Sequence, residues 1–368
     1  MAIAFPSAEV SRIEPIAQTG IDTADQIQTR VLPQNDAAAP SNLDAPLRPT
    51  ASINLGAPAI PGDLANHARY EVVGFLGAGG MGTVFKAWHR LMDRPVALKV
   101  IHPDWADEPA MIERFEREIR AAARLCHPNI VVAHDAERAG AACFLVMEFV
   151  EGVSLEQRLR QEKLSVPRVC DYLRQTALGL QHAHERGVVH HDIKPQNLMV
   201  TSQGQVKILY FGLARCTEHA GPTRVGRNPA PLDESALATA ELTDDDATPC
   251  WRGRKAAEMA AGYPMGTADY LAPEEIDDPR HADIRADIYS LGCTLYRCLT
   301  GQVPFAGQNL VQKLKAHRKC TPTPVDALCP NLPPALARVV ARMMAKDPVD
   351  RYQVPAEVAE ALAAFAGC

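Results

Sequence analysis

The pattern of apolar and polar positions separates an irregular leader from a folded region. Residues 1 to about 65 are rich in Ala, Pro, Asp, Asn and Gln, and six prolines between Pro33 and Pro61 interrupt any helical or strand period. A segment of this composition cannot bury enough apolar surface to fold by itself. We therefore predict a disordered leader over residues 1–66 and a folded domain over residues 70–366.

The first part of the folded domain is predicted to be a small β-sheet that carries one helix. Apolar runs on both sides of a glycine-rich turn indicate strands, and a mixed polar and apolar repeat indicates a helix that ends before His127-Pro128. The predicted strands cover residues 70–80, 83–89, 94–101, 129–138 and 143–150, and the predicted helix covers residues 110–125.

After Gly152 the pattern becomes mostly helical. The predicted helices cover residues 166–187 and 287–301, the predicted short strands cover residues 188–192, 197–201 and 206–211, and a polar stretch from about Cys216 to Tyr263 has little periodicity. A late apolar stripe comprises Leu336, Val339, Val340, Met343 and Met344. It could contact a membrane surface or a partner helix, but a stripe that ends at Lys346-Asp347-Pro348 is more often core, and we predict core.

Composition and charge exclude several classes of protein. The chain has 368 residues, 47% of them hydrophobic, which is enough for a large core, and its formal net charge of -6 gives no basic field for nucleic acid. No signal-like N-terminus and no apolar run of about 18 residues is visible, so we expect a cytoplasmic protein without a membrane span. Ten cysteines without a CxxC pair predict reduced, mostly buried thiols.

A glycine-rich turn is the first candidate binding motif. Gly77, Gly79 and Gly82 follow the pattern GxGxxGxV between two predicted strands, where the absence of Cβ atoms lets backbone amides approach a polyphosphate. A dinucleotide-binding turn looks similar but needs a helix directly after the glycines, and an unliganded hairpin is also possible. The motif resembles the glycine loop of protein kinases, which implies ATP contacts from Leu76, Gly77, Ala78, Gly79, Gly80, Gly82 and Val84.

A second motif is Lys99 in the apolar run VALKV, followed by Glu118 in the predicted helix. A lysine in such a strand is usually an edge residue whose amine reaches solvent. The resemblance to kinases instead implies that Glu118 pairs with Lys99 and directs its ammonium group at the nucleotide phosphates. Glu118 is selected over Glu113 and Glu116 by this resemblance alone.

The segment VVHHDIKPQNLMV is the most informative motif. It resembles the kinase catalytic loop HRDxKxxN, which implies that Asp192 accepts the substrate proton, Lys194 neutralises the transferring phosphoryl group and Asn197 holds a metal ion. A lysine two residues after the aspartate is typical of Ser/Thr kinases. The chain is similar to bacterial Ser/Thr protein kinases over about 300 residues.

This resemblance implies an α+β, two-lobed protein kinase fold. The small β-rich N-lobe would cover residues 70–147, the hinge 148–152 and the larger helical C-lobe 153–366, with an activation segment over about 210–274. Further residues take roles by motif: Met147 as gatekeeper, Glu148 to Val150 as the adenine hinge, Ala97 as a further ATP contact, Asp287 as the brace of the catalytic loop, and Glu274 as the partner of Arg351. ATP and Mg²⁺ are the implied cofactors, and proteins the implied substrates or partners.

The sequence departs from the family at its main metal ligand. Where the motif should read Asp-Phe-Gly, this chain has Tyr210-Phe211-Gly212. A phenol is neutral at pH 7 and is a poor ligand for Mg²⁺, and the neighbouring residues offer no carboxylate. His191 also replaces the arginine that pairs with a phosphorylated activation segment. The extra residues of that segment include Thr243 and Thr248 and form either a regulated docking arm or an unstructured surface loop.

Three functions follow from these observations. The chain could be an ATP-binding kinase-like protein with impaired phosphoryl transfer to protein Ser/Thr, which is the reading we favour. It could instead be an active Ser/Thr kinase with low or atypical metal dependence, because the other motif residues are intact. A nucleotide-independent scaffold that uses the leader is the third possibility.

Overall fold

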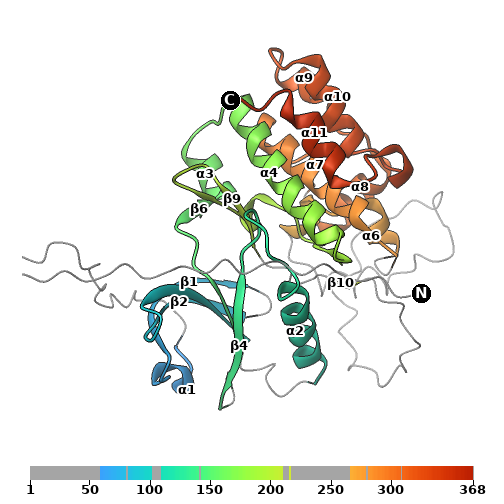
Figure 1. Cartoon of the computed structure of the whole chain (residues 1–368). Coiled ribbons are helices and arrows are strands. Elements are labelled where there is room, and N and C mark those ends of the chain that lie inside the picture. Colours follow the sequence, from blue (N-terminus) through green and yellow to red (C-terminus); the bar gives the residue numbers. More distant parts are fainter. Residues whose placement is uncertain are drawn as a thin grey trace, which may run out of the picture. The chain divides into compact units, whose positions relative to one another are not determined.

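The computed structural model describes residues 59–79, 82–101, 109–140, 142–209, 215–216, 266–278, 281–307 and 309–367. The predictions for residues 1–58, for Gly80, for Tyr210 to Gly212, and for the insertion with Thr243 and Thr248 therefore lie outside the described residues. The predicted order of a β-rich N-terminal part followed by a helical C-terminal part is confirmed (Figure 1).

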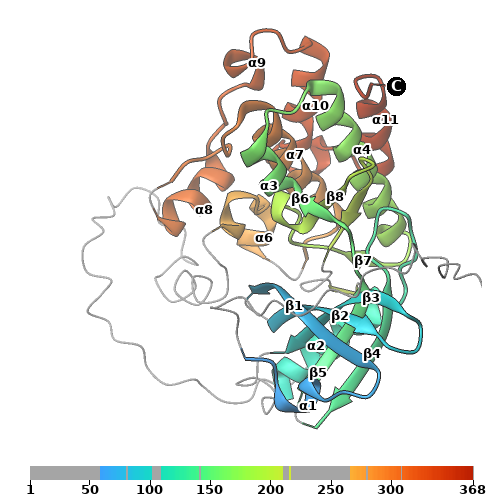
Figure 2. The ribbon, with the colours of Figure 1, turned by 90° about the vertical axis from the view of Figure 1, so that its left-hand side faces the viewer.

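The N-terminal part is an antiparallel five-stranded sheet (Figure 2). In space its strands run β1-β2-β3-β5-β4. Their bounds are Tyr70–Gly79 for β1, Gly82–His89 for β2, Arg94–Ile101 for β3, Ala133–Ala139 for β4 and Ala142–Glu148 for β5. Helix α2 covers Pro109–Ala122 and the short helix α1 covers Gly62–Ala65.

Alternate side chains of the sheet enter two different apolar clusters, as the two-residue period of a strand requires. Phe85, Leu98 and Phe144 pack with Leu64 of α1 in one cluster. A second cluster contains Phe115 of α2. The helices α1 and α2 therefore serve opposite faces of the sheet.

Two predictions for this part need correction. The end of the predicted disordered leader forms α1, because Leu64 is completely buried against the sheet. The predicted strand over residues 129–138 begins only at Ala133. Ile130 is apolar for another reason: it forms an isolated bridge to Ile208, and the neighbouring Val131 amide donates to the Ile208 carbonyl.

The C-terminal part is built around helices α4 (Val166–His184) and α7 (Ile284–Thr300), which contact each other and α11 (Pro355–Ala363) (Figure 1). Helix α4 ends before the predicted residue 187, where Gly187 has a left-handed φ of 68°. The other helices within the described ranges are α3 (Leu155–Gln161), α6 (Pro273–Asp277), α8 (Leu310–Lys319), α9 (Val325–Leu328) and α10 (Pro334–Met343).

Short strands and 3₁₀ turns carry the connections. The strands are β6 (Gly152–Ser154), β7 (Val188–Val189), β8 (Leu198–Thr201), β9 (Val206–Ile208) and β10 (Arg215–Cys216), and the turns are η2 (Pro195–Asn197), η5 (Thr267–Asp269) and η6 (Pro348–Asp350). Strand β8 pairs with both β6 and β9, while β10 pairs with β7. The sheet β6-β8-β9 flanks η2, so it fixes the end of the predicted catalytic loop.

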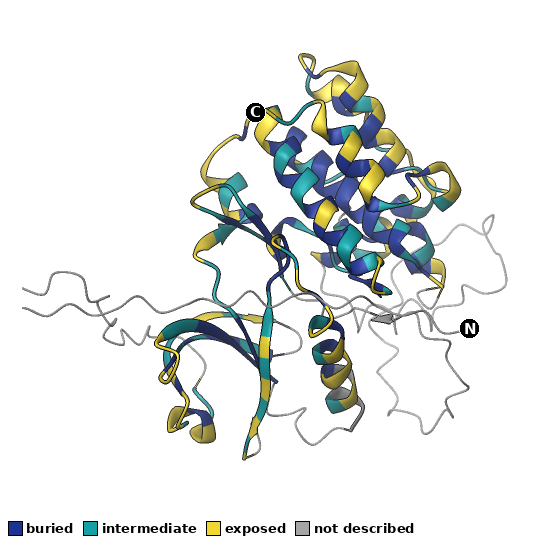
Figure 3. Cartoon of the chain, viewed as in Figure 1, coloured by how far each residue is buried: buried dark blue, intermediate teal, exposed yellow. Residues whose placement is uncertain are grey.

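Burial is greatest on α7, which lies inside the helical part (Figure 3). The predicted core stripe on α10 is confirmed, since all five of its side chains are buried. Seven of the described cysteines, those with described side chains, are free thiols, as predicted, but only Cys170, Cys293 and Cys298 among them are buried. The expectation of mostly buried thiols is therefore wrong for the described cysteines, because the others lie on half-buried or exposed stretches. None of the helices in the described part of the chain combines the length and the apolar character that spanning a bilayer requires.

Candidate active site

Side chains along β3 point alternately to the two faces of the sheet, and this determines which way Lys99 points. Lys99 lies two residues after Ala97 and two before Ile101, and both of these pack in the cluster with Phe115 of α2. Its ammonium group forms an ion pair with Glu118 of α2, and the two side chains are only 8% and 2% exposed. The expected pair is therefore present, and its role towards a nucleotide remains a prediction.

The two carboxylates that were not selected lie on the outer side of α2. Glu113 pairs with Arg117 and Glu116 pairs with Arg120, and each of these four side chains is at least half exposed. Only Glu118 is placed inside, because it falls on the helix face that meets the sheet. The geometry thus gives a local reason for the selection that the sequence made by resemblance alone.

Four of the predicted ATP contacts come together as one apolar group. Val84, Ala97 and Met147 are buried in the same cluster, and Val150 packs against it from the segment after β5. Leu209 also joins this cluster and was not predicted as a site residue. Its only sequence signal was its place directly before Tyr210.

The side chain of Glu148 is held by the protein itself. Its carboxylate accepts hydrogen bonds from Lys207 Nζ at 2.8 and 2.9 Å, and from the backbone amide of Val132 at 3.2 Å. These contacts tie the end of β5 to β9 and to the start of β4. A base at this position would therefore meet the backbone of the predicted hinge rather than this carboxylate.

The glycine motif forms the β1–β2 hairpin, in which Gly77 pairs with Val84, Ala78 with Thr83 and Gly79 with Gly82. Gly82 has a φ of 156°, and a Cβ there would lie 2.0 Å from the Val100 carbonyl oxygen. Glycine is therefore required at this position by β3 as well as by any phosphate. Leu76 remains 48% exposed at the hairpin.

The predicted catalytic residues meet within one short loop. Asn197 donates from Nδ2 to the backbone oxygen and to Oδ2 of Asp192, both at 2.8 Å. Lys194 Nζ lies 2.8 Å from Asp192 Oδ1 and donates to Thr267 Oγ1, also at 2.8 Å. Thr267 was missed by the sequence reasoning, although it lies only seven residues before the predicted site residue Glu274. The loop is thus linked to the segment after the insertion.

Asp287 braces this loop, as predicted. Its two carboxylate oxygens accept the backbone N–H groups of His190 and His191, each at 2.8 Å. Complete burial raises the pKa of Asp287 to about 6, although nearby His191 and the two amides act in the opposite direction. Burial also lowers the pKa of His190 to about 4, so its imidazole is neutral at pH 7. It contacts the Leu209 carbonyl at 2.9 Å.

The predicted pair of Glu274 and Arg351 is also confirmed. Two nitrogens of the Arg351 guanidinium donate to the two oxygens of Glu274, at 2.6 and 2.7 Å, and the guanidinium is completely buried. His191 instead contacts the next carboxylate, with Nδ1 2.9 Å from Glu275 Oε1. Residues 273–277 of α6 are therefore held from two sides.

The expected metal site fits only in part. Asn197 uses its amide nitrogen on Asp192, which leaves the carbonyl oxygen as the kind of neutral ligand that Mg²⁺ accepts. Tyr210 lies outside the described residues. Within the described part of the chain, no group of three or more His, Cys, Asp or Glu side chains is placed to hold a metal ion.

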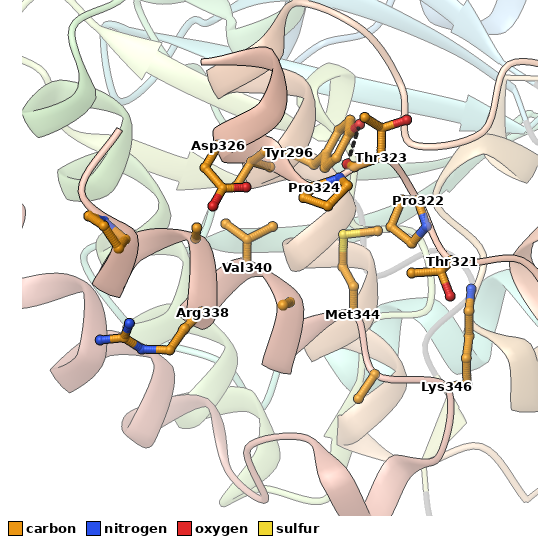
Figure 4. Close-up of a pocket in the computed structure, with 15 residues that line it drawn as sticks. Tyr296, Thr321, Pro322, Thr323, Pro324, Asp326, Arg338, Val340, Met344 and Lys346 are labelled. Atoms are coloured by element: carbon orange, nitrogen blue, oxygen red, sulfur yellow. Dashed lines mark hydrogen bonds between the residues drawn. The ribbon is translucent and has the colours of Figure 1, made fainter. Parts of the chain in front are cut away.

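A separate cavity of about 520 Å³ lies in the helical part, between α10, the end of α7 and residues 321–326 (Figure 4). Val340 and Met344 lie along it, with Arg338 and Lys346 towards opposite ends. None of the predicted site residues lines it. The cavity therefore does not belong to the candidate active site.

Comparison with known proteins gives the family. A profile described as the protein kinase domain matches residues 70–229 and 253–362. This chain belongs to the protein kinase domain family, and its relatives are Ser/Thr kinases.

The chain is 34% identical over 295 residues to the serine/threonine-protein kinase PknB of Mycobacterium tuberculosis, covering 79% of this chain and 42% of that protein. It is also 34% identical over 302 residues to PknA of the same organism, covering 80% of this chain and 61% of that protein. The chain therefore spans less than two thirds of the length of these relatives. The crystal structure of the M. tuberculosis PknI kinase domain superposes with a TM-score of 0.57 at 25% identity, covering 83% of this chain and 100% of that chain.

Proposed function

We propose that this chain binds ATP in the manner of its family and transfers phosphate to protein Ser or Thr only weakly. The observation that carries the proposal is the buried ion pair of Lys99 with Glu118. Removing a charge pair from water is costly, and such buried pairs cluster at functional sites. Here the pair lies on the sheet face that also carries predicted ATP contacts.

Each group of predicted residues takes a distinct role in binding. Val84, Ala97, Met147 and Leu209 supply an apolar surface for a purine, while the backbone at Glu148 and Val150 meets its polar edge. Lys99, held by Glu118, faces the phosphates together with the hairpin of Gly77, Gly79 and Gly82. Since few of these groups act through a metal, we expect the affinity for ATP to depend little on Mg²⁺.

The weak point is the metal. When bound, Mg²⁺ neutralises charge between the β- and γ-phosphates, and its remaining family ligand in this chain is the neutral Asn197. A loss of several kcal/mol of transition-state stabilisation corresponds to about three factors of ten or more in rate. Tyr210 in place of the usual aspartate is the reason that we propose impaired transfer.

A working kinase is the second candidate, and the catalytic loop favours it. Asp192 is positioned by Asn197, and Lys194 joins Asp192 to Thr267, which supports Asp192 as the proton acceptor and Lys194 as the nearby cation. Such an arrangement is what a general base and a phosphate-neutralising lysine need. Under this alternative, residual transfer would rely on Lys194 more than on metal.

Calorimetric titration with ATP tests the binding proposal, with and without Mg²⁺. Lys99→Met should abolish binding, whereas Lys163→Met, a change at an exposed lysine, should not. Absence of binding by the wild-type chain up to millimolar ATP would refute the proposal.

A radiolabel assay tests transfer, with a generic basic acceptor protein and Mg²⁺ or Mn²⁺. We expect little label above an Asp192→Asn control and a gain of at least about 10-fold for Tyr210→Asp. Strong label that disappears in Asp192→Asn would favour the working kinase, and no gain in Tyr210→Asp would show that the metal argument is wrong.

A further inference from the structure

His191 occupies an unusual backbone position in the catalytic loop. Its φ of 63° is left-handed, which is uncommon for a residue other than glycine. The conformation is maintained by Asp287, which accepts the consecutive amides of His190 and His191 at 2.8 Å each. The turn is therefore fixed by the core helix α7, and the His191 side chain leaves it in a defined direction.

That direction leads to Glu275, at the start of helix α6. Oε1 of Glu275 lies 2.9 Å from His191 Nδ1, while Oε2 accepts the backbone N–H of Ala272 at 3.0 Å. The two side chains are only 8% and 4% exposed. One carboxylate thus connects the catalytic loop, the helix N-terminus and the preceding residue.

We infer that His191 and Glu275 form an internal latch that holds residues 266–278 against the catalytic loop without any phosphate group. The chain itself provides the carboxylate that contacts His191 Nδ1. A phosphate brought to His191 would face two buried carboxylates, Glu275 and Asp287, and like charges at such short range repel strongly. Glu275 is accordingly a positioning residue for the proposed reaction.

The latch complements contacts elsewhere on the same segment. Thr267 binds Lys194, the Tyr270 carbonyl accepts from Ser290 at 2.7 Å, and Asp269 pairs with Lys313. These contacts secure residues 267–270, and Glu274 is secured by Arg351. The His191 contact with Glu275 joins α6 directly to the turn before Asp192, so its loss should loosen α6 relative to that turn.

Hydrogen exchange of the full chain, read by mass spectrometry, tests the latch. Amides of residues 266–278 should keep their protection after phosphatase treatment that leaves no phosphate by intact mass. His191→Gln and Glu275→Gln should each raise exchange there by at least about 10-fold, because a hydrogen bond to a charged group contributes more than one factor of ten. The double variant should exchange no faster than either single variant.

His281→Gln is the matched control, because its imidazole pairs with Asp278 near the same segment but is 84% exposed. It should change exchange less than about 2-fold, as expected of a surface pair. Unchanged exchange in either latch variant would overturn the inference. Loss of wild-type protection after phosphatase would also overturn it, and that arm needs no variant to fold.

The consequence for phosphoryl transfer rests on the proposed function, but the exchange measurement needs neither ATP nor transfer. A chain that fails to bind ATP while its latch variants lose protection would refute the first proposal and support the second. A chain that binds ATP while its latch variants keep their protection would support the first proposal and refute the second.

Discussion

Replacing Glu274 by glutamine should destabilise the helical part strongly. The Arg351 guanidinium is completely buried and donates five hydrogen bonds, two to Glu274 and three to the carbonyls of Arg285, Ala345 and Lys346. Glutamine keeps the size of the side chain and one acceptor oxygen. It removes the negative charge that balances a buried cation.

The size of the effect follows from this environment. Removing one partner of a buried ion pair costs about 3–5 kcal/mol, because the other charge stays uncompensated. Glu274 retains 21% side-chain exposure, so water can compensate part of the loss, and we expect about 3 kcal/mol. With a urea dependence of about 3 kcal/mol/M for a domain of this size, the unfolding midpoint should fall by about 1 M.

Urea unfolding at pH 7, followed by circular dichroism, measures this shift. The matched control is Glu116→Gln, which breaks the exposed pair with Arg120 and should cost less than about 0.5 kcal/mol. A loss below about 1 kcal/mol for Glu274→Gln would show that the three carbonyls alone satisfy Arg351, and the reasoning from charge would fail.

Two further predictions concern packing and pH. Gly292→Ala should lower the free energy of unfolding in urea by about 1–3 kcal/mol, because the new Cβ would lie 2.8 Å from Met343 Cβ. Gly74→Ala is the control, because its Cβ would meet nothing within 4 Å and should avoid this penalty. Burial lowers the pKa of His317 to about 3 and that of His190 to about 4, so below pH 6.5 the unfolded chain binds protons that the folded chain does not. The free energy of unfolding should therefore fall as pH drops from about 6.5 to 4. His317→Gln should reduce this pH dependence by up to about 1.4 kcal/mol per pH unit. Urea midpoints determined at each pH measure it. An unchanged slope would mean that His317 does not contribute.

Elements with a strong local period were predictable from the sequence. Apolar residues recur regularly along the strand that contains Lys99 and along the helix that contains Leu173, Ala177 and Leu180. The structure contains both elements. The strand expected from residue 129 was placed too early, because Ile130 and Val131 are apolar for a contact with Ile208, almost 80 residues away. Periodicity alone cannot distinguish that kind of burial from a strand.

The site residues also divide into those that a local motif identifies and those that only the fold brings together. Asp192, Lys194 and Asn197 stand within six residues of one another, so a motif could identify them together. Thr267 and Glu275 reach the catalytic loop across 73 and 84 positions of sequence, and neither has a local pattern that marks it. Their role depends on α7, which holds both segments through Asp287 and Ser290. Such contacts become visible only in three dimensions.

The two departures from the family have different physical consequences. At His191 the chain supplies Glu275 as a buried partner, so the substitution comes with a compensating contact. At Tyr210 the neighbouring sequence supplies no carboxylate, so a lost metal ligand has no local replacement. Where a compensating contact exists, replacing the native residue should reduce function. Where none exists, restoring the residue usual in the family should increase function. In the phosphoryl-transfer assay, His191→Gln is therefore expected to lower the rate and Tyr210→Asp to raise it. If both variants changed the rate in the same direction, one of the two arguments would be wrong.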